Sequence, residues 1–272
     1  MATIPVKVQS RIKETLKRFQ AIIELAKARD VGEADTSTLV KDILSELFGY
    51  DKYSEITAEY QIKSTYCDLA IKLEGKLVIL VEVKAINVEL KEIHIKQAVD
   101  YAANQGVEWV VLTNAQTWQI YKVSFGQPIS NELLMTLNFP VFNAKDESDM
   151  NGLFLLTREA QGKSLLNEYL QLRQALNRYS IGAVVLSEPV LSAIRRELRR
   201  LSPDTKIDLE EIVHVLTDEV IKRDVLEGDR AIEAKRKVAK ASTKMLRTKA
   251  EKEESLQVVL STAQSVMPKP VQ

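Results

Sequence analysis

Two amphipathic stretches open the chain, and both have the periodicity of helices. Apolar residues recur every three or four positions over residues 12–26, which predicts a helix with one buried face. A break at residues 30–32 separates it from a second predicted helix, which starts near Asp35 or Thr36. Gly49 is expected to end that helix, because glycine readily takes the positive φ found at helix C-termini.

The pattern then changes to strand-forming residues. The stretch from Leu77 to Lys84 (LVILVEVK) is almost continuously apolar, which predicts a central strand covered on both faces. The strands are predicted over residues 60–73, 77–84, 109–114 and 117–123, with a helix over residues 92–104. The order helix, helix, strand, strand, helix, strand, strand indicates a mixed α/β core with one helical crossover.

The strand signal fades after about residue 145, and helical periodicity replaces it. Helices are predicted over residues 153–176, 189–201 and 209–226, followed by a charged, alanine-rich segment over residues 229–254. The tail at residues 268–270 is expected to be disordered. We therefore predict an α/β domain over residues 1–145 and an all-α region over residues 146–272.

Charge and cysteine content narrow the functional classes. The 272 residues carry 38 Lys and Arg against 38 Asp and Glu, and this balance argues against a protein that coats DNA, although not against a local basic groove. The one cysteine, Cys67, excludes an internal disulfide and fits a reducing, cytoplasmic setting. The sequence has no apolar run of about 18 residues, so no transmembrane helix is predicted. Residues 1–8 lack the apolar stretch of a secretory signal.

The same counts restrict the metals that the chain can bind. Two histidines and one cysteine cannot form a His/Cys zinc site within one chain. Any metal would therefore be held mainly by oxygen ligands, which favours Mg²⁺ or Mn²⁺.

Three charged residues stand out within the strand region. Glu82 and Lys84 share one face of their predicted strand, and an antiparallel turn at residues 74–76 can place Asp68 beside them. Burying unpaired charge in an apolar strand pair is costly. Two carboxylates and an ammonium are, however, the groups that metal-assisted phosphodiester hydrolysis requires.

A second motif follows on the predicted helix, where Gln97 and Tyr101 lie four residues apart. Asp68, Glu82-Val83-Lys84 and this QxxxY pair together resemble the PD-(D/E)XK nuclease superfamily. More narrowly, they are similar to the N-terminal nuclease domain of type I restriction enzyme R subunits and its stand-alone relatives. The similarity covers about residues 30–125 and implies a restriction-endonuclease-like sheet flanked by helices, and a Mg²⁺- or Mn²⁺-dependent endonuclease acting on DNA.

The resemblance also implies roles for individual residues. The metal ligands would be Asp68, Glu82, the Val83 carbonyl and, upstream, Glu33; the catalytic set would be Asp68, Glu82 and Lys84; Gln97 and Tyr101 would contact the nucleic-acid backbone. His94, almost on the face of Gln97, is expected at the surface or against a phosphate. Cys67 stands where the family has a proline, and we expect it to be a small buried side chain.

Other interpretations of these residues stay open. Glu82 and Lys84 are also compatible with a plain cross-strand ion pair, and Tyr101 with a core tyrosine. The whole domain could be a non-catalytic nucleic-acid- or protein-binding module in a defence or regulatory assembly. Four arginines between residues 195 and 200 indicate a solvated or self-associating helix, or a phosphate-binding face. The expected partners are DNA and a second copy bound through the C-terminal helices, with no membrane.

Overall fold

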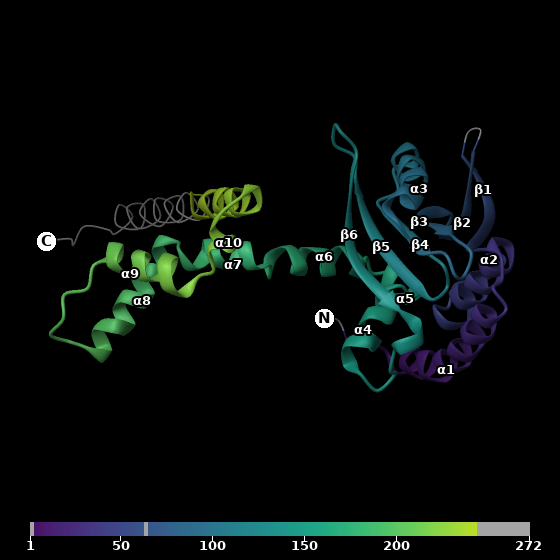
Figure 1. The fold of residues 1–272 in the computed structure, drawn as a ribbon, viewed down its shortest axis with the longest axis horizontal. Coiled ribbons are helices and arrows are strands. Elements are labelled where there is room, and N and C mark those ends of the chain that lie inside the picture. The colour runs from purple at the N-terminus through teal and green to yellow at the C-terminus, as the bar shows by residue number, and fades with distance from the viewer. Residues whose placement is uncertain (1–2, 63–64, 244–272) are drawn as a thin grey trace, which may run out of the picture. The chain divides into compact units, whose positions relative to one another are not determined.

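The computed structural model describes residues 3–62 and 65–243, which fall into two compact units divided between Leu170 and Gln171 (Figure 1). Within the part of the chain so described, no helix is both long enough and apolar enough to cross a membrane.

The first unit is built on a six-stranded sheet whose strands lie in sequence order. The strands are β1 (Ile56–Ile62), β2 (Thr65–Leu73), β3 (Lys76–Val83), β4 (Trp109–Thr113), β5 (Thr117–Ser124) and β6 (Ser130–Asn138). All neighbours are antiparallel except β3 and β4, which are parallel and joined through helix α3 (Glu92–Gln105). A parallel pair needs such a crossover, which explains why a helix interrupts the strands here.

Helices cover both faces of this sheet (Figure 1). The helical elements of the first unit are α1 (Val6–Ala28), α2 (Glu33–Asp42) with the π-helical turn η1 (Ile43–Leu47), α3, the short η2 (Phe139–Val141), α4 (Glu147–Leu155), α5 (Arg158–Gln161) and the start of α6 (Leu165–Ala175), which continues past Leu170 into the second unit. The mixed sheet with flanking helices, followed by an all-α region, confirms the fold class expected from the sequence.

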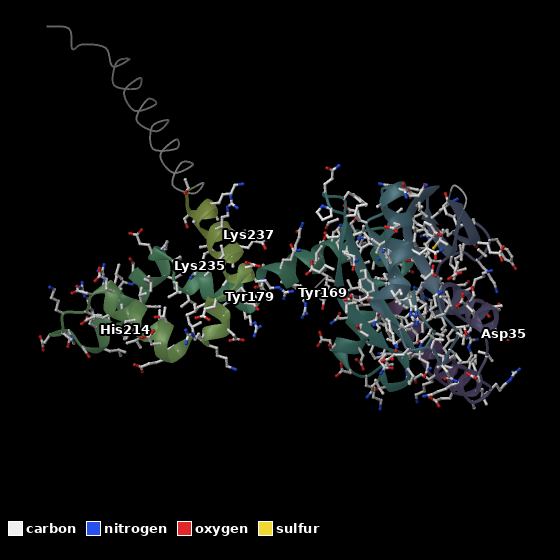
Figure 2. All side chains as sticks on the ribbon, turned by 45° about the horizontal axis from the view of Figure 1, so that its top comes forward. Asp35, Tyr169, Tyr179, His214, Lys235 and Lys237 are labelled. Carbon is white, nitrogen blue, oxygen red and sulfur yellow. The ribbon has the colours of Figure 1, made fainter. Side chains whose placement is uncertain are left out.

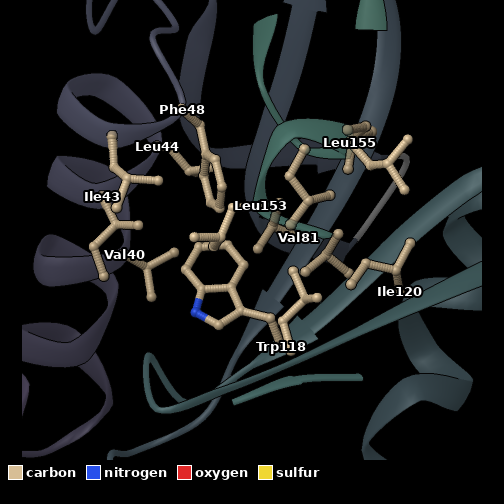
Figure 3. Close-up of a cluster of buried hydrophobic side chains, with 14 of the residues drawn as sticks. Val40, Ile43, Leu44, Phe48, Val81, Trp118, Ile120, Leu153 and Leu155 are labelled. Carbon is tan, nitrogen blue, oxygen red and sulfur yellow. The ribbon is translucent and has the colours of Figure 1, made fainter. Parts of the chain in front are cut away.

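The larger hydrophobic core lies between the sheet and helices α1, α2 and α4. Strand side chains alternate between the two faces, so Ile79, Val81 and Val83 of β3 point into this core. At its centre Trp118 is fully buried, with its ring centroid 5.4 Å from that of Phe48 and 5.5 Å from that of Phe139. Figure 3 shows Trp118 and Phe48 enclosed by aliphatic side chains from the helices and the sheet.

A smaller core lies on the opposite face, beneath α3. There Leu80, Val110 and Leu112 of the central strands meet the apolar side of the helix, including Ile95 and Ala98. Because Glu82 is two residues beyond Leu80, its side chain lies on the α3 face of the sheet. The larger core thus lies on one face of the sheet, and Glu82 of the candidate site lies on the other.

Several predicted elements differ from the observed ones. The strand expected over residues 60–73 is divided between β1 and β2, because both halves are rich in strand formers and the connection between them has no glycine or proline. Strand β6 was not predicted, since it is an edge strand with only Leu134 and Leu137 buried. The helix expected over residues 153–176 is broken into α4, α5 and α6; Thr157 accepts a hydrogen bond from the Ala160 N–H and starts α5.

The division between the units also differs from the expected boundary at residues 145–146. Residues 147–170 belong with the α/β unit, because Met150, Leu153 and Leu166 are buried in its larger core. The polar connection that precedes them is a surface loop within the unit and not a linker between units.

The second unit is helical and has little buried surface. Its elements are α7 (Arg178–Val185), α8 (Glu188–Leu201), α9 (Leu209–Val215), the π-helical turn η3 (Leu216–Val220), α10 (Arg223–Leu226) and a helix over residues 229–243 that carries Lys235 and Lys237 on its surface (Figure 2). Helix α7 was not predicted, and the helix expected over residues 209–226 is interrupted. The remainder of the predicted segment 229–254 and the tail at residues 268–270 lie outside the described residues.

Candidate active site

The candidate site lies where strands β2 and β3 separate. Their antiparallel register pairs Leu69 with Val81, so Asp68 and Glu82 are neighbours at the next position along the two strands. Beyond that point a side-chain contact replaces the backbone hydrogen bonds between β2 and β3: the Val83 N–H donates to Asp68 Oδ2 at 2.7 Å. The sequence prediction that a turn brings Asp68 beside the Glu82 strand agrees with this arrangement.

Lys84 follows directly after β3 and completes the cluster. Its Nζ lies 2.8 Å from Glu82 Oε1 and 3.5 Å from Glu33 Oε2. Its backbone N–H donates to the Thr113 carbonyl at 2.8 Å, which continues the parallel pairing with β4 and fixes the backbone beneath the ammonium. The side chain of Glu82 is 7% exposed and that of Lys84 is 19% exposed, so the pair is largely withdrawn from water.

Glu33 reaches this cluster from the first residue of helix α2. The loop after β3 is tied to the corner between α1 and α2, where the Ile86 N–H lies 3.4 Å from the Val31 carbonyl. Asn87 Nδ2 also donates to Asp30 Oδ1 at 2.7 Å. These contacts hold the start of α2 against the loop that carries Lys84, so that Glu33, 51% exposed, forms the outer side of the cluster.

The carboxylates sit in an environment that disfavours their charge. Burial raises the pKa of Asp68, although the Val83 N–H and Lys84 oppose the rise. Burial likewise raises the pKa of Glu82 against the opposing hydrogen bond from Lys84. Burial alone would lower the pKa of Lys84, but the hydrogen bond and charge of Glu82, with the charges of Glu33 and Asp68, raise it overall. The cluster is therefore short of positive charge.

A divalent cation suits this donor set. Three carboxylates, from Glu33, Asp68 and Glu82, surround one ammonium, and hard oxygen donors are the ligands that Mg²⁺ and Mn²⁺ prefer. Across residues 3–62 and 65–243, however, no three side chains of His, Cys, Asp or Glu form a metal-binding group by themselves. A bound cation would thus need the Val83 carbonyl or water besides Asp68 and Glu82, and Glu33 contacts Lys84 rather than the other carboxylates.

The predicted nucleic-acid contacts lie on helix α3. Gln97 Nε2 donates to the Tyr101 hydroxyl, which confirms that the two side chains share a helix face. Tyr101 is 6% exposed and belongs to the smaller core, whereas Gln97 is exposed. In the described structure neither makes a hydrogen bond or ion pair with Asp68, Glu82 or Lys84. Their role toward nucleic acid stays a prediction.

His94 has a local structural contact at the start of α3. Its Nδ1 accepts a hydrogen bond from the Lys91 N–H at 3.2 Å, so the imidazole satisfies one of the free amides at the helix start. The ring is partly exposed, as a surface position requires.

Cys67 is buried next to the site, and its thiol is not activated. Its thiol lies 3.4 Å from the Leu69 and Val81 carbonyl oxygens. Burial, reinforced by the charges of Glu82 and Asp68, raises its pKa to about 12, so it stays a neutral thiol near pH 7. It fills space before Asp68, as expected, and does not add a ligand.

Two residues that the sequence prediction missed also bear on the site. The charge of Glu59, on β1, contributes to the raised pKa of Asp68, which shows that β1 runs beside the cluster. Asn87 fixes the corner from which Glu33 projects. Only the tertiary fold brings them close, because neither lies in a motif or at a helical or strand spacing from Asp68.

Comparison with known proteins gives one family match. Residues 38–136 match the family model of the type I restriction enzyme R protein N terminus (HSDR_N), which is just over a third of the chain. The match includes Asp68, Glu82, Lys84 and the α3 residues, but it begins after Glu33. No curated protein and no solved structure matches the chain. The resemblance to the N-terminal domain of type I restriction enzyme R proteins is confirmed for these residues.

Proposed function

We propose that the first unit is a Mg²⁺-dependent deoxyribonuclease that cleaves internal phosphodiester bonds of DNA, as part of a restriction-type defence system. The observation that carries the proposal is the convergence of Asp68, Glu82 and Lys84 at the point where β2 and β3 separate. The family match over residues 38–136 supports the same chemistry.

The residues of the cluster would have different roles in hydrolysis. Asp68 and Glu82, with the Val83 carbonyl, would hold the cation, and Glu33 is the remaining carboxylate that can join or support them. Bound Mg²⁺ supplies neutralisation of the phosphate charge and a water of lowered pKa. Lys84, held by Glu82 and Glu33, presents an ammonium that can donate to the water or to the developing negative charge. Gln97 and Tyr101 would contact the DNA backbone from α3.

A cleavage assay tests this function. Supercoiled and linear DNA incubated with the wild-type protein and Mg²⁺ should be nicked or cut, and EDTA should stop the reaction. Asp68→Asn should lose the activity, because it removes the charge of a predicted ligand while keeping its shape. Asp100→Asn is the matched control, since Asp100 is exposed on α3 and should leave cleavage unchanged. Equal cleavage by wild type and Asp68→Asn would refute the assignment, as would no cleavage of any DNA form by wild type.

A non-catalytic role for the same fold is the second candidate. It is favoured by one observation, that no three metal-binding side chains are grouped among the described residues. In that case the fold would bind nucleic acid or protein in the same kind of defence assembly without holding a metal.

We also propose that the second unit associates with a second copy of the chain. Few of the apolar side chains described in this unit are buried, and several large ones are exposed: Leu176, Ile181, Val184, Leu201, Val215, Val220 and Ile232. Soluble monomers rarely leave so much apolar surface on a small unit. Light scattering should give a mass of at least twice the 30.7 kDa of one chain; a monomer at all micromolar concentrations would contradict this.

A further inference from the structure

Helix α8 of the second unit presents a continuous face of arginines. At about 100° per residue, Arg195, Arg199, Arg196 and Arg200 fall in that order across an arc of about 140°. The opposite side holds Leu191, which is buried, and Ile194, which is half-buried against the rest of the unit. The first part of this apolar side therefore packs inward, whereas Leu198 and Leu201 near its C-terminal end are exposed. The arginine face points away from this apolar side.

The arginines are poorly neutralised by the protein itself. Among the described residues, Glu197 is the one carboxylate that pairs with them, 3.2 Å from Arg196 and 2.7 Å from Arg200. Arg199 donates to the Ile207 carbonyl at 3.3 Å, and Arg195 makes no hydrogen bond or ion pair with another described residue. Arg196 and Arg200 remain 72% and 75% exposed. Positive charge thus exceeds its local partners on this face.

This arrangement is unfavourable for the helix alone. Arg195 and Arg199, and likewise Arg196 and Arg200, are like-charge pairs four residues apart, which destabilise a helix. The charges complement a polyanion instead. Arginine is suited to phosphate because its planar guanidinium donates two parallel hydrogen bonds to it.

We propose that the arginine face of α8, defined by Arg195, Arg196, Arg199 and Arg200, binds the phosphate backbone of duplex DNA as a contact surface separate from the candidate active site. The proposal rests on DNA being the substrate of the first unit. The second unit would then bind the same substrate through its phosphate backbone. A lipid surface fits less well, because Leu191 and Ile194 of the apolar side of α8 pack within the unit, and only Leu198 and Leu201, near the C-terminal end of the helix, are exposed. The contact is independent of base sequence, since phosphate contacts carry no sequence information.

DNA binding as a function of salt tests the proposal directly. Fluorescence anisotropy with a labelled duplex, in EDTA so that no cleavage occurs, gives the affinity between about 50 and 200 mM salt. The variant with Arg195, Arg196, Arg199 and Arg200 all changed to Gln should bind at least about tenfold more weakly near 100 mM salt. Its plot of log K against log salt should be shallower by about 3 to 4, since each phosphate contact contributes about 0.9 to the slope.

The matched control removes four positive charges from one helix of the first unit. Lys7, Lys13, Lys17 and Lys27 of α1 are exposed and pair with no described carboxylate. Changing them to Gln alters the net charge equally and should change the slope by less than about 1. Circular dichroism should show unchanged helix content for both variants, and the α8 variant should melt no lower than wild type, because its substitutions remove like-charge pairs four residues apart.

Glu197→Gln provides a test of opposite sign. This change frees Arg196 and Arg200 from their carboxylate and should tighten DNA binding. Unchanged or weaker binding would count against the proposal even if the arginine variant were lost to misfolding.

The outcomes separate this proposal from the function of the first unit. If wild type binds DNA and the arginine variant binds equally well, the α8 proposal is wrong while the nuclease proposal stands. Equal losses in the arginine variant and the α1 control would indicate a net-charge effect and would also overturn it. Arginine-dependent binding to vesicles rich in anionic lipid, without arginine-dependent binding to DNA, would assign the face to a membrane. If wild type binds no DNA, both proposals fail.

Discussion

Lys84→Met is expected to slow Mg²⁺-dependent DNA cleavage by about 10²–10³-fold, the loss typical of removing one preorganised donor to a developing negative charge. The Lys84 ammonium is held 2.8 Å from Glu82 and 3.5 Å from Glu33, and its backbone is fixed by β4. Methionine keeps the length of the side chain but removes the charge and the donors. Single-turnover cleavage with excess enzyme measures the rate of the chemical step without product release.

Lys72→Met is the matched control for this substitution. Lys72 is another lysine of the sheet, on β2, and its ammonium lies over the ring of Tyr60, not beside the carboxylates of the site. The Lys72→Met protein should cleave DNA at the wild-type rate. Melting of the Lys84 variant should be recorded in Mg²⁺, because Glu82 would otherwise be left buried without its partner. A folded Lys84→Met protein that cleaves at the wild-type rate would remove Lys84 from the mechanism.

Trp118→Ala is expected to lower the free energy of unfolding by about 3–5 kcal/mol, a large share of the roughly 5–15 kcal/mol that stabilises a typical domain. Trp118 is fully buried between Phe48 and Phe139 and below the helices that cover the sheet (Figure 3). Its indole N–H also donates to the Ala115 carbonyl at 3.0 Å. Alanine would leave a large cavity and an unpaired carbonyl.

Urea denaturation, monitored by the fluorescence of Trp109, measures this loss of unfolding free energy. Trp109 lies on β4 of the same unit and is the one tryptophan left in the variant, so its signal reports unfolding of the α/β unit. Tyr53→Ala is the control, since the Tyr53 side chain is 93% exposed and its removal should change stability by less than about 0.5 kcal/mol. A loss below about 1 kcal/mol for Trp118→Ala would show that this cluster is not the centre of the core.

The sequence predicted the centre of the site because that centre depends on short-range rules. Glu82 and Lys84 are two residues apart at the end of one strand, and Asp68 lies across a hairpin whose turn, Glu74–Gly75, has positive φ at both residues. Strand period and turn chemistry determine such placements. The roles proposed for these residues come from the family resemblance, because spacing alone does not assign them.

Other parts of the site and fold depend on contacts that no local pattern encodes. Glu33 lies 51 residues before Lys84 and reaches it only because Asn87 and Ile86 bind the corner before α2. The edge strand β6 has little burial to signal it, since most of its side chains face water. The helix expected over residues 153–176 is too long because Thr157 caps a new helix inside it. The helix expected over residues 209–226 is interrupted before α10, at Ile221 and Lys222.

Isothermal titration calorimetry with Mn²⁺ tests the central claim most directly, because a nuclease of this kind must hold a divalent cation at Asp68 and Glu82. Wild type and Lys84→Met should bind the metal, and Glu82→Gln should lose that binding. Glu89→Gln, a change at an exposed carboxylate, should keep it. Wild-type protein that binds no Mn²⁺, or Glu82→Gln protein that binds it as wild type does, would contradict the account and leave a non-catalytic module of the same fold.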